Sequence, residues 1–132
     1  DRLRSRGLGD VYKRQDIDAV LDLQDINAKF MSELKKMNPF GPDNQKPVFC
    51  SLGVKDYGTS KLVGKDLEHI KLELIDDKSN TPIHGIAFGM HQHNTHIKNM
   101  KPFNICYTIE ENTYNGNTSL QLMVKDIKEN DI

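Results

Sequence analysis

Three prolines in one short segment, Pro39, Pro42 and Pro47, place the strongest constraint on how this chain folds. Each proline fixes φ and removes a backbone donor, so neither a helix interior nor a central strand can pass through the segment. Gly41 suits a turn position with positive φ, and Phe49 predicts a buried apolar end. The segment therefore predicts a rigid turn between a first part with helical patterning and a second part with strand patterning.

The residues before this turn predict one short strand and one helix. Residues 16–23 partly alternate apolar and polar side chains, which indicates an extended lead-in. Asp25 is typical of an N-cap. Apolar side chains then recur at helical spacing as far as Met37, so we expect a helix over residues 25–37 that packs on the core. Pro39 ends it.

After the turn, apolar residues recur with a period of two, which predicts strands. We expect strands over residues 48–57, 67–75, 82–90, 103–111 and 119–127. In the third strand we expect Ile86 and Phe88 to point inward, and the glycines at 85 and 89 to mark bulges or barrel curvature. Asn115-Gly116 predicts the turn of a final hairpin.

This order predicts a mainly β fold: a five-stranded OB-type barrel preceded by one α-helix and a Pro-rich turn, with a polar, partly helical insertion before the fourth strand. An open antiparallel meander packed on the helix is the alternative. We divide the chain into an artefactual or disordered tail (residues 1–15), the lead-in strand, helix and turn (16–47), the barrel (48–128) and a frayed end (129–132).

The tail matters for the charge of the remaining chain. Residues 1–15 carry five Lys or Arg and two Asp, a net +3, so the 18 basic and 19 acidic residues of the whole chain fall to 13 against 17. The remainder is mildly acidic, which argues against binding nucleic acid through charge alone. A basic arm that binds nucleic acid is the alternative interpretation of the tail. No membrane-length apolar run or secretory signal is visible, so we expect a cytoplasmic protein without membrane contacts.

The Pro-rich turn resembles the segment Pro-Phe-Gly-x-Gly-Asn-Pro-x-Pro-x-Phe that leads into the C-terminal OB-type domain of RecJ, the single-strand-specific 5′→3′ DNA exonuclease. Asp43 and Gln45 depart from that pattern, where the family has Gly and Pro. The residues that carry the resemblance are Pro39, Phe40, Gly41, Asn44, Pro47 and Phe49.

Later segments are similar to the same family in order and spacing. They are His69–Leu74, Gly85–Phe88, the hairpin around Asn112, Tyr114 and Gly116 with Leu120–Leu122, and Val124–Ile127. The resemblance implies an accessory domain that binds single-stranded DNA in repair and recombination. RecJ enzymes cut DNA with a metal-binding core that includes an Asp-His-His motif, and this sequence contains no such triplet. We therefore expect a fragment without catalytic residues, metal or cofactor.

The resemblance further implies that the parent protein is a metal-dependent exodeoxyribonuclease whose core holds Mn or Mg. The implied partners are single-stranded DNA, that nuclease core and, as a further candidate, single-strand-binding protein. A structural interaction domain that packs on the core and touches DNA little is the alternative function.

Single-strand binding by such barrels needs a cationic groove and exposed aromatic surfaces. Glu73 and the turn Asp76-Asp77 would repel DNA, so we expect them to lie off its path. The candidate DNA-binding residues lie on the first two strands, in their connection and in the last hairpin: Lys55, Tyr57, Lys61, Lys65, His69, Lys71, Tyr114, Asn115 and Lys125. The alternative interpretation is that these residues form an ordinary solubilising surface.

Two further groups of residues, three histidines and two cysteines, could suggest a metal site or a reactive thiol, but each lacks the partners that such a site needs. The run His91-x-His93-x-x-His96 lacks a Cys or carboxylate at the usual ligand spacing, so we expect a solvated connection and no metal site. Cys50 and Cys106 stand apart from any CxxC or Cys/His pattern. We expect both to be reduced strand residues, neither nucleophiles nor a disulfide.

Overall fold

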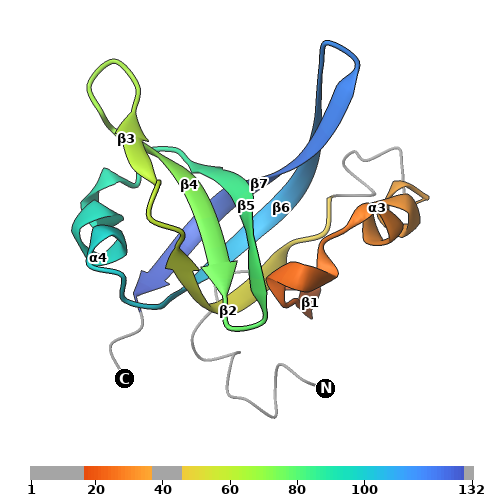
Figure 1. Ribbon diagram of the computed structural model, residues 1–132, viewed down its shortest axis with the longest axis horizontal. Helices are drawn as coiled ribbons and strands as arrows, with labels where there is room; N and C mark the ends of the chain where they lie inside the picture. The colour runs from red at the N-terminus through yellow and green to blue at the C-terminus, as the bar shows by residue number, and fades with distance from the viewer. Residues whose placement is uncertain (1–16, 37–45, 130–132) are drawn as a thin grey trace.

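The computed structural model describes residues 17–36 and 46–129 of the protein. Within these ranges one seven-stranded sheet curls on itself, with helical segments at its sides (Figure 1). The helical segments are the 3-10 helices η1 (Leu23–Asp25) and η2 (His91–His93) and the α-helices α3 (Ala28–Lys35) and α4 (Asn94–Lys98). The strands are β1 (Ala19–Val20), β2 (Phe49–Asp56), β3 (Lys61–Val63), β4 (His69–Asp76), β5 (Ser79–Ala87), β6 (Phe103–Tyr114) and β7 (Asn117–Glu129).

A pairing between β2 and β4 closes the sheet into a barrel. The strand order is β1-β2-β6-β7-β5-β4-β3, and Asp56 of β2 also pairs with Leu74 of β4. The closed ring therefore contains β2, β6, β7, β5 and β4, while β1 and β3 lie outside it. β5 and β7 run parallel, and the other neighbours in the ring are antiparallel. The predicted five-stranded OB-type barrel is confirmed, and the open meander is excluded.

The core is formed by the side chains that point to the inside of the barrel, which in β4 are every second residue. Ile70, Leu72 and Leu74 of β4 are fully buried, as the period of two predicted. α4 contributes Ile97, which is fully buried in the same cluster. The polar segment between the third and fourth barrel strands therefore contributes an apolar residue to the core through one short helix.

The prediction for β5 was wrong about which face points inward. Gly85 and Ala87 are buried, whereas Ile86 is half-buried and Phe88 is 56 % exposed. A Cβ atom on Gly85 would lie 3.2 Å from the carbonyl oxygen of Leu122, because β7 passes close to β5. The inner side of β5 thus has room for small residues only, and the two large apolar side chains lie outside the barrel.

The N-cap of the lead-in helix lies two residues after the predicted N-cap, Asp25. Asn27 is the N-cap, and its Oδ1 accepts a hydrogen bond from the backbone N–H of Phe30 at 2.9 Å. Asp25 instead belongs to η1, where its carboxylate accepts from the Asp22 N–H. The rings of Phe30 and Phe49 meet edge to face, with centroids 5.5 Å apart. The helix therefore packs on the first residue of β2.

The Pro-Phe-Gly turn is described only at its end. Pro47 and Phe49 are buried, which agrees with a turn whose apolar end packs on the barrel. Pro39, Phe40, Gly41 and Asn44 lie outside the described residues, as does the predicted tail at residues 1–15.

Candidate nucleic-acid interface

The outer face of β4 and β5 carries two of the candidate binding residues, His69 and Lys71. Lys71 of β4 is exposed and pairs with Ile86 of β5, while Glu73 pairs with His84. Strands of this kind alternate between core and solvent, so these side chains stand on the side opposite the buried leucines. In OB-type barrels this face and its flanking loops bind oligonucleotides.

Phe88 and His69 form a fixed aromatic pair at one end of this face. Their ring centroids are 5.0 Å apart and the rings meet edge to face at 76°. The Gly89 N–H donates to His69 Nδ1 at 2.8 Å, so the proton of the neutral imidazole lies on Nε2, which is 3.0 Å from Glu68 Oε1. The imidazole is held on both nitrogens, and the Phe88 ring beside it remains open to solvent. Such a ring offers a base a surface on which to stack.

The lysines predicted for the first connection lie beside this pair. Lys61 of β3 is the direct cross-strand partner of Lys71, and Val63 pairs with His69. Two lysines are therefore direct cross-strand neighbours, and both are exposed, so a phosphate can reach both ammonium groups. Lys65 is exposed in the loop that follows β3. In Figure 1 this loop and the β6–β7 hairpin extend from the same side of the barrel.

Tyr57 and Lys55 lie at the point where β2 leaves the barrel. Tyr57 is 49 % exposed, and its backbone N–H donates to the Glu73 carbonyl at 2.8 Å. Lys55 is half-buried and pairs with Ile75, near the closure of the barrel. Tyr57 is thus tied to β4 through its backbone while its side chain faces solvent.

The last hairpin does not bring its three predicted residues together. Asn115 and Gly116 form the tip, both with positive φ (52° and 80°), as the Asn-Gly pair predicted. Lys125 instead follows Val124, the partner of Ala87, so it lies at the Phe88 end of β5. Eight residues of β7, 117–124, lie between it and the tip, a length of roughly 26 Å. The side chain of Tyr114 is outside the described set.

Glu73 lies on the same outer face as Lys71, as the period of two in β4 predicted. Its carboxylate accepts a hydrogen bond from Thr59 Oγ1 and lies 2.9 Å from His84 Nδ1. These two partners hold the carboxylate away from the Phe88 end of the face.

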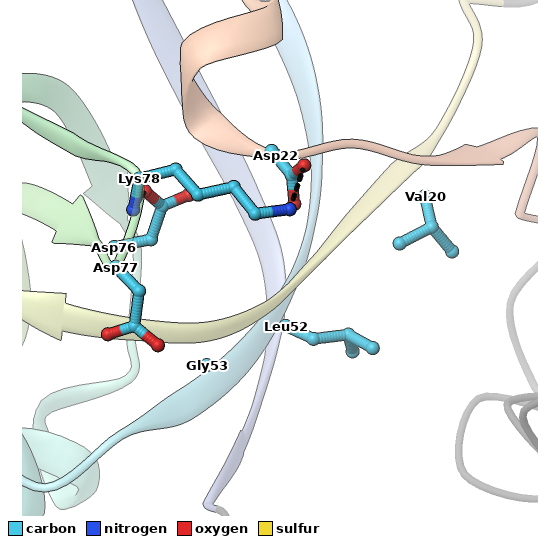
Figure 2. Close-up of a pocket in the computed structure, with 7 residues that line it drawn as sticks. All are labelled: Val20, Asp22, Leu52, Gly53, Asp76, Asp77 and Lys78. Carbon is cyan, nitrogen blue, oxygen red and sulfur yellow. Dashed lines mark hydrogen bonds and ion pairs between the residues drawn. The ribbon is translucent and has the colours of Figure 1, made fainter.

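The turn after β4 is acidic and lines a pocket of about 330 Å³ at the other end of that strand (Figure 2). Asp76 accepts from the backbone N–H groups of Leu23 and Lys78, both at 2.9 Å. The Asp22 carboxylate lies 2.8 Å from Lys78 Nζ, and this hydrogen bond raises the pKa of Lys78. His69 and Asp76 are the first and last residues of β4, so the aromatic pair and the acidic turn lie at opposite ends of this strand.

Sequence reasoning missed Phe88 and Ile86 as surface residues. The available signal was the pair Gly85 and Ala87. In a small closed barrel, small residues in alternation suggest a strand whose inner face is crowded, which places their larger neighbours outside.

The histidine run has a structural role in the described part of the chain. His93 Nδ1 lies 2.7 Å from Glu129 Oε2, and His96 Nε2 donates to the Pro102 carbonyl at 2.9 Å. The first contact ties η2 to the end of β7, and the second ties α4 to the residue before β6. Among residues 17–36 and 46–129, no group of three His, Cys, Asp or Glu is arranged to hold a metal ion.

The two cysteines face each other across β2 and β6. Cys50 and Cys106 are direct cross-strand partners and are both fully buried. A hydrogen bond with Cys50, together with burial, raises the pKa of the Cys106 thiol far above its ordinary value. A thiol held protonated in this way is a poor nucleophile.

A shallow apolar groove lies where α3 meets the first residues of β2. It has a volume of about 270 Å³ and is lined by Ala19, Phe30, Leu34 and Phe49. Asp18 and Glu33 add two carboxylates to it. Its apolar lining suits a protein contact.

Comparisons with known proteins agree with this architecture. Residues 17–126 match the family model described as the RecJ OB domain. Two crystal structures of RecJ from Thermus thermophilus, in complex with Mn²⁺ and with Mg²⁺, are similar in fold, with TM-scores of 0.63 and 0.60 and identities of 16 % and 14 %. Both similarities cover 88 % of this chain, which spans only 16 % and 17 % of those RecJ chains. No curated protein matches the sequence. No helix within the described ranges is long and apolar enough to cross a membrane.

Proposed function

Because the chain belongs to the family of RecJ OB domains, we propose that it is a non-catalytic domain that binds single-stranded DNA on behalf of a RecJ-type 5′→3′ exonuclease. The parent protein would act in DNA repair and recombination in the cytoplasm. Its nuclease core, which is not part of this sequence, would hold the divalent Mn or Mg. The contact with single-strand-binding protein that the resemblance implied has no support from the comparisons, so the proposal omits it.

The exposed ring of Phe88 is the observation that carries the proposal. His69 holds it edge-on, and the Lys61–Lys71 pair stands next to it. A base stacked on Phe88 would gain about 1–3 kcal/mol, while the two ammonium groups neutralise the adjoining phosphates. Stacking tolerates any base and requires an unpaired one, so this arrangement fits a single strand without sequence preference.

A titration of the 132-residue chain with fluorescent oligo(dT) at low salt tests the proposal. Phe88→Ala should weaken binding by about 5- to 150-fold, the equivalent of one lost stack. Lys71→Glu should weaken it as well. Met100→Ala removes an exposed apolar side chain elsewhere, and Lys29→Glu reverses a charge on α3, so these matched controls should bind like the wild type. Equal loss in the controls, or no binding by the wild type, contradicts the proposal.

The same preparation should show no nuclease activity with manganese, because hydrolysis is assigned to the core. Turnover of DNA by the pure chain would overturn that assignment.

The apolar groove beside α3 favours a second candidate function, an interaction domain that docks on the nuclease core. Phe30 and Leu34 would provide its apolar contact surface. If the wild-type chain binds no oligo(dT) even at low salt, this second candidate becomes the better interpretation.

A further inference from the structure

A buried charged cluster fixes the segment that carries Tyr57. The carboxylate of Asp56, the last residue of β2, is fully buried. It accepts the Ser60 N–H at 3.0 Å and lies 3.4 Å from Lys98 Nζ. The same ammonium donates to the Ser60 carbonyl at 2.8 Å. Asp56 and Lys98 thus hold both backbone polar groups of Ser60, and we name these three residues the Ser60 clamp.

The segment held by the clamp lies beside β4 and is hydrogen-bonded to its backbone. Residues 57–60 interrupt the path from β2 to β3. The segment is joined to Glu73 at both ends, since the Tyr57 N–H donates to the Glu73 carbonyl at 2.8 Å and the Glu73 N–H donates to Ser60 Oγ at 2.9 Å. Lys61 follows immediately and pairs with Lys71. The clamp therefore sets where Tyr57 stands relative to the Phe88 end of the face, whereas Lys61 is held by its own strand pairing.

The buried charge of Asp56 favours one arrangement of the clamp over others. A buried carboxylate is costly unless all its partners are in place. Burial raises the pKa of Asp56, while hydrogen bonds from Ser60 and Gly58 and the charge of Lys98 lower it, and the net shift is downward. The carboxylate stays ionised at neutral pH, and partial rearrangements of the segment would leave this charge without partners.

We propose that Asp56 and Lys98 are positioning residues for nucleic-acid binding: they hold residues 57–60 so that Tyr57 meets the strand, without touching it themselves. This inference rests on the proposed function. Lys98 directs its ammonium to Asp56 and the Ser60 carbonyl. An ordered segment binds more tightly because less conformational freedom is lost on binding.

The test replaces Lys98 and compares it with a neighbour of the same charge. Lys98→Met should weaken oligo(dT) binding by about 3- to 10-fold and leave the salt dependence of affinity unchanged, because no phosphate contact is lost. Lys101→Met removes an equal charge from an exposed position a few residues away, and should bind like the wild type. Lys98→Arg can still bridge the carboxylate and the carbonyl, so it should restore most of the affinity.

A double-mutant cycle asks whether Lys98 acts through Tyr57. If it does, Lys98→Met combined with Tyr57→Ala should bind about as weakly as Tyr57→Ala alone, since both changes remove the same contribution. Independent, multiplying losses would overturn the proposal. So would equal losses and equal changes of salt dependence in Lys98→Met and Lys101→Met, because Lys98 would then act by charge alone.

Amide hydrogen exchange on the DNA-free protein separates this inference from the proposed function. In Lys98→Met the Ser60 and Tyr57 amides should exchange faster while those of β6 and β7 are unchanged. If instead they exchange as in the wild type, the clamp does not order the segment and the inference fails, whatever the DNA result. If Lys98→Met does not fold, Asp56→Asn, which keeps the side-chain shape, serves for the same measurements. A wild-type chain that binds no DNA defeats the proposed function, and the positioning role falls with it.

Discussion

Tyr107 shows how a polar side chain is accommodated inside this barrel. Its hydroxyl lies 2.8 Å from Ser51 Oγ, which in turn donates to the Leu21 carbonyl at 2.8 Å. The Ser51 proton is used for that carbonyl, so the Tyr107 hydroxyl is the donor to Ser51. Burial raises the pKa of Tyr107, so the phenol keeps its proton. One chain of hydrogen bonds thereby joins β6, β2 and the lead-in segment.

Tyr107→Phe should lower the free energy of unfolding by about 1 kcal/mol, the net value of one internal hydrogen bond. Ser51 keeps its bond to the Leu21 carbonyl, which limits the loss. Urea denaturation measures it, with Tyr57→Phe as the control at an exposed site. A loss no larger than that of the control would show that this hydrogen bond adds nothing to stability.

At the scale of elements, β5 shows what periodicity can and cannot predict. Its alternation indicated a strand with two distinct faces, and that prediction holds. The assignment of the inner face was wrong because Ile86 and Phe88 are the more hydrophobic residues, and a single sequence favours placing such residues inside. The close approach of β7 to Gly85 decides the matter, and this contact joins residues that are far apart in the chain.

Gly85→Ala should destabilise the protein by about 1–3 kcal/mol, as is usual for overpacked interiors. The new methyl group would meet the backbone oxygen of Leu122 at 3.2 Å, and a backbone atom paired in a sheet cannot easily move. Thermal denaturation measures the effect, and Thr81→Ala on the exposed part of β5 is the control. An unchanged or higher melting temperature would mean that β5 and β7 can separate at little cost.

The final turn was predicted correctly, whereas the N-cap of α3 and the position of Lys125 were not. The tight turn at Asn115-Gly116 depends on local backbone preference, so the sequence was sufficient to predict it. The N-cap was misplaced from Asn27 to Asp25, because both residue types cap helices and local sequence does not distinguish them. Lys125 was grouped with the hairpin tip because it is near in sequence, although strand register carries it to the far end of β5.

At the scale of the whole molecule, a group of lysines and the acidic turn are separated: they lie towards opposite ends of β4. The net charge of the chain is −1, yet Lys61, Lys71 and Lys125 lie towards the Phe88 end and the acidic turn lies at the opposite end of β4. A protein arranged in this way attracts phosphate locally while its overall charge gives little long-range attraction.

The salt dependence of DNA binding should reflect this arrangement. Three lysines that each neutralise one phosphate of a single strand predict a slope of about −2 in a plot of log affinity against log salt, at about −0.7 per phosphate. Oligo(dT) titrations over a series of salt concentrations measure the slope, and Lys125→Met should reduce it by about 0.7. A much steeper slope that survives Lys61→Met and Lys71→Met would show that other charges, such as the basic residues 1–15, dominate binding.

The sequence by itself determined the class of fold, the number of barrel strands, the final turn and the family resemblance, because these depend on local backbone preference and on apolar periodicity. Only the tertiary structure decided which face of β5 is buried, that His69 and Phe88 form one aromatic pair, and that Lys98 reaches the segment of Tyr57. Those relations arise from strand register and barrel closure, which bring together residues distant in the chain, and no local pattern specifies them.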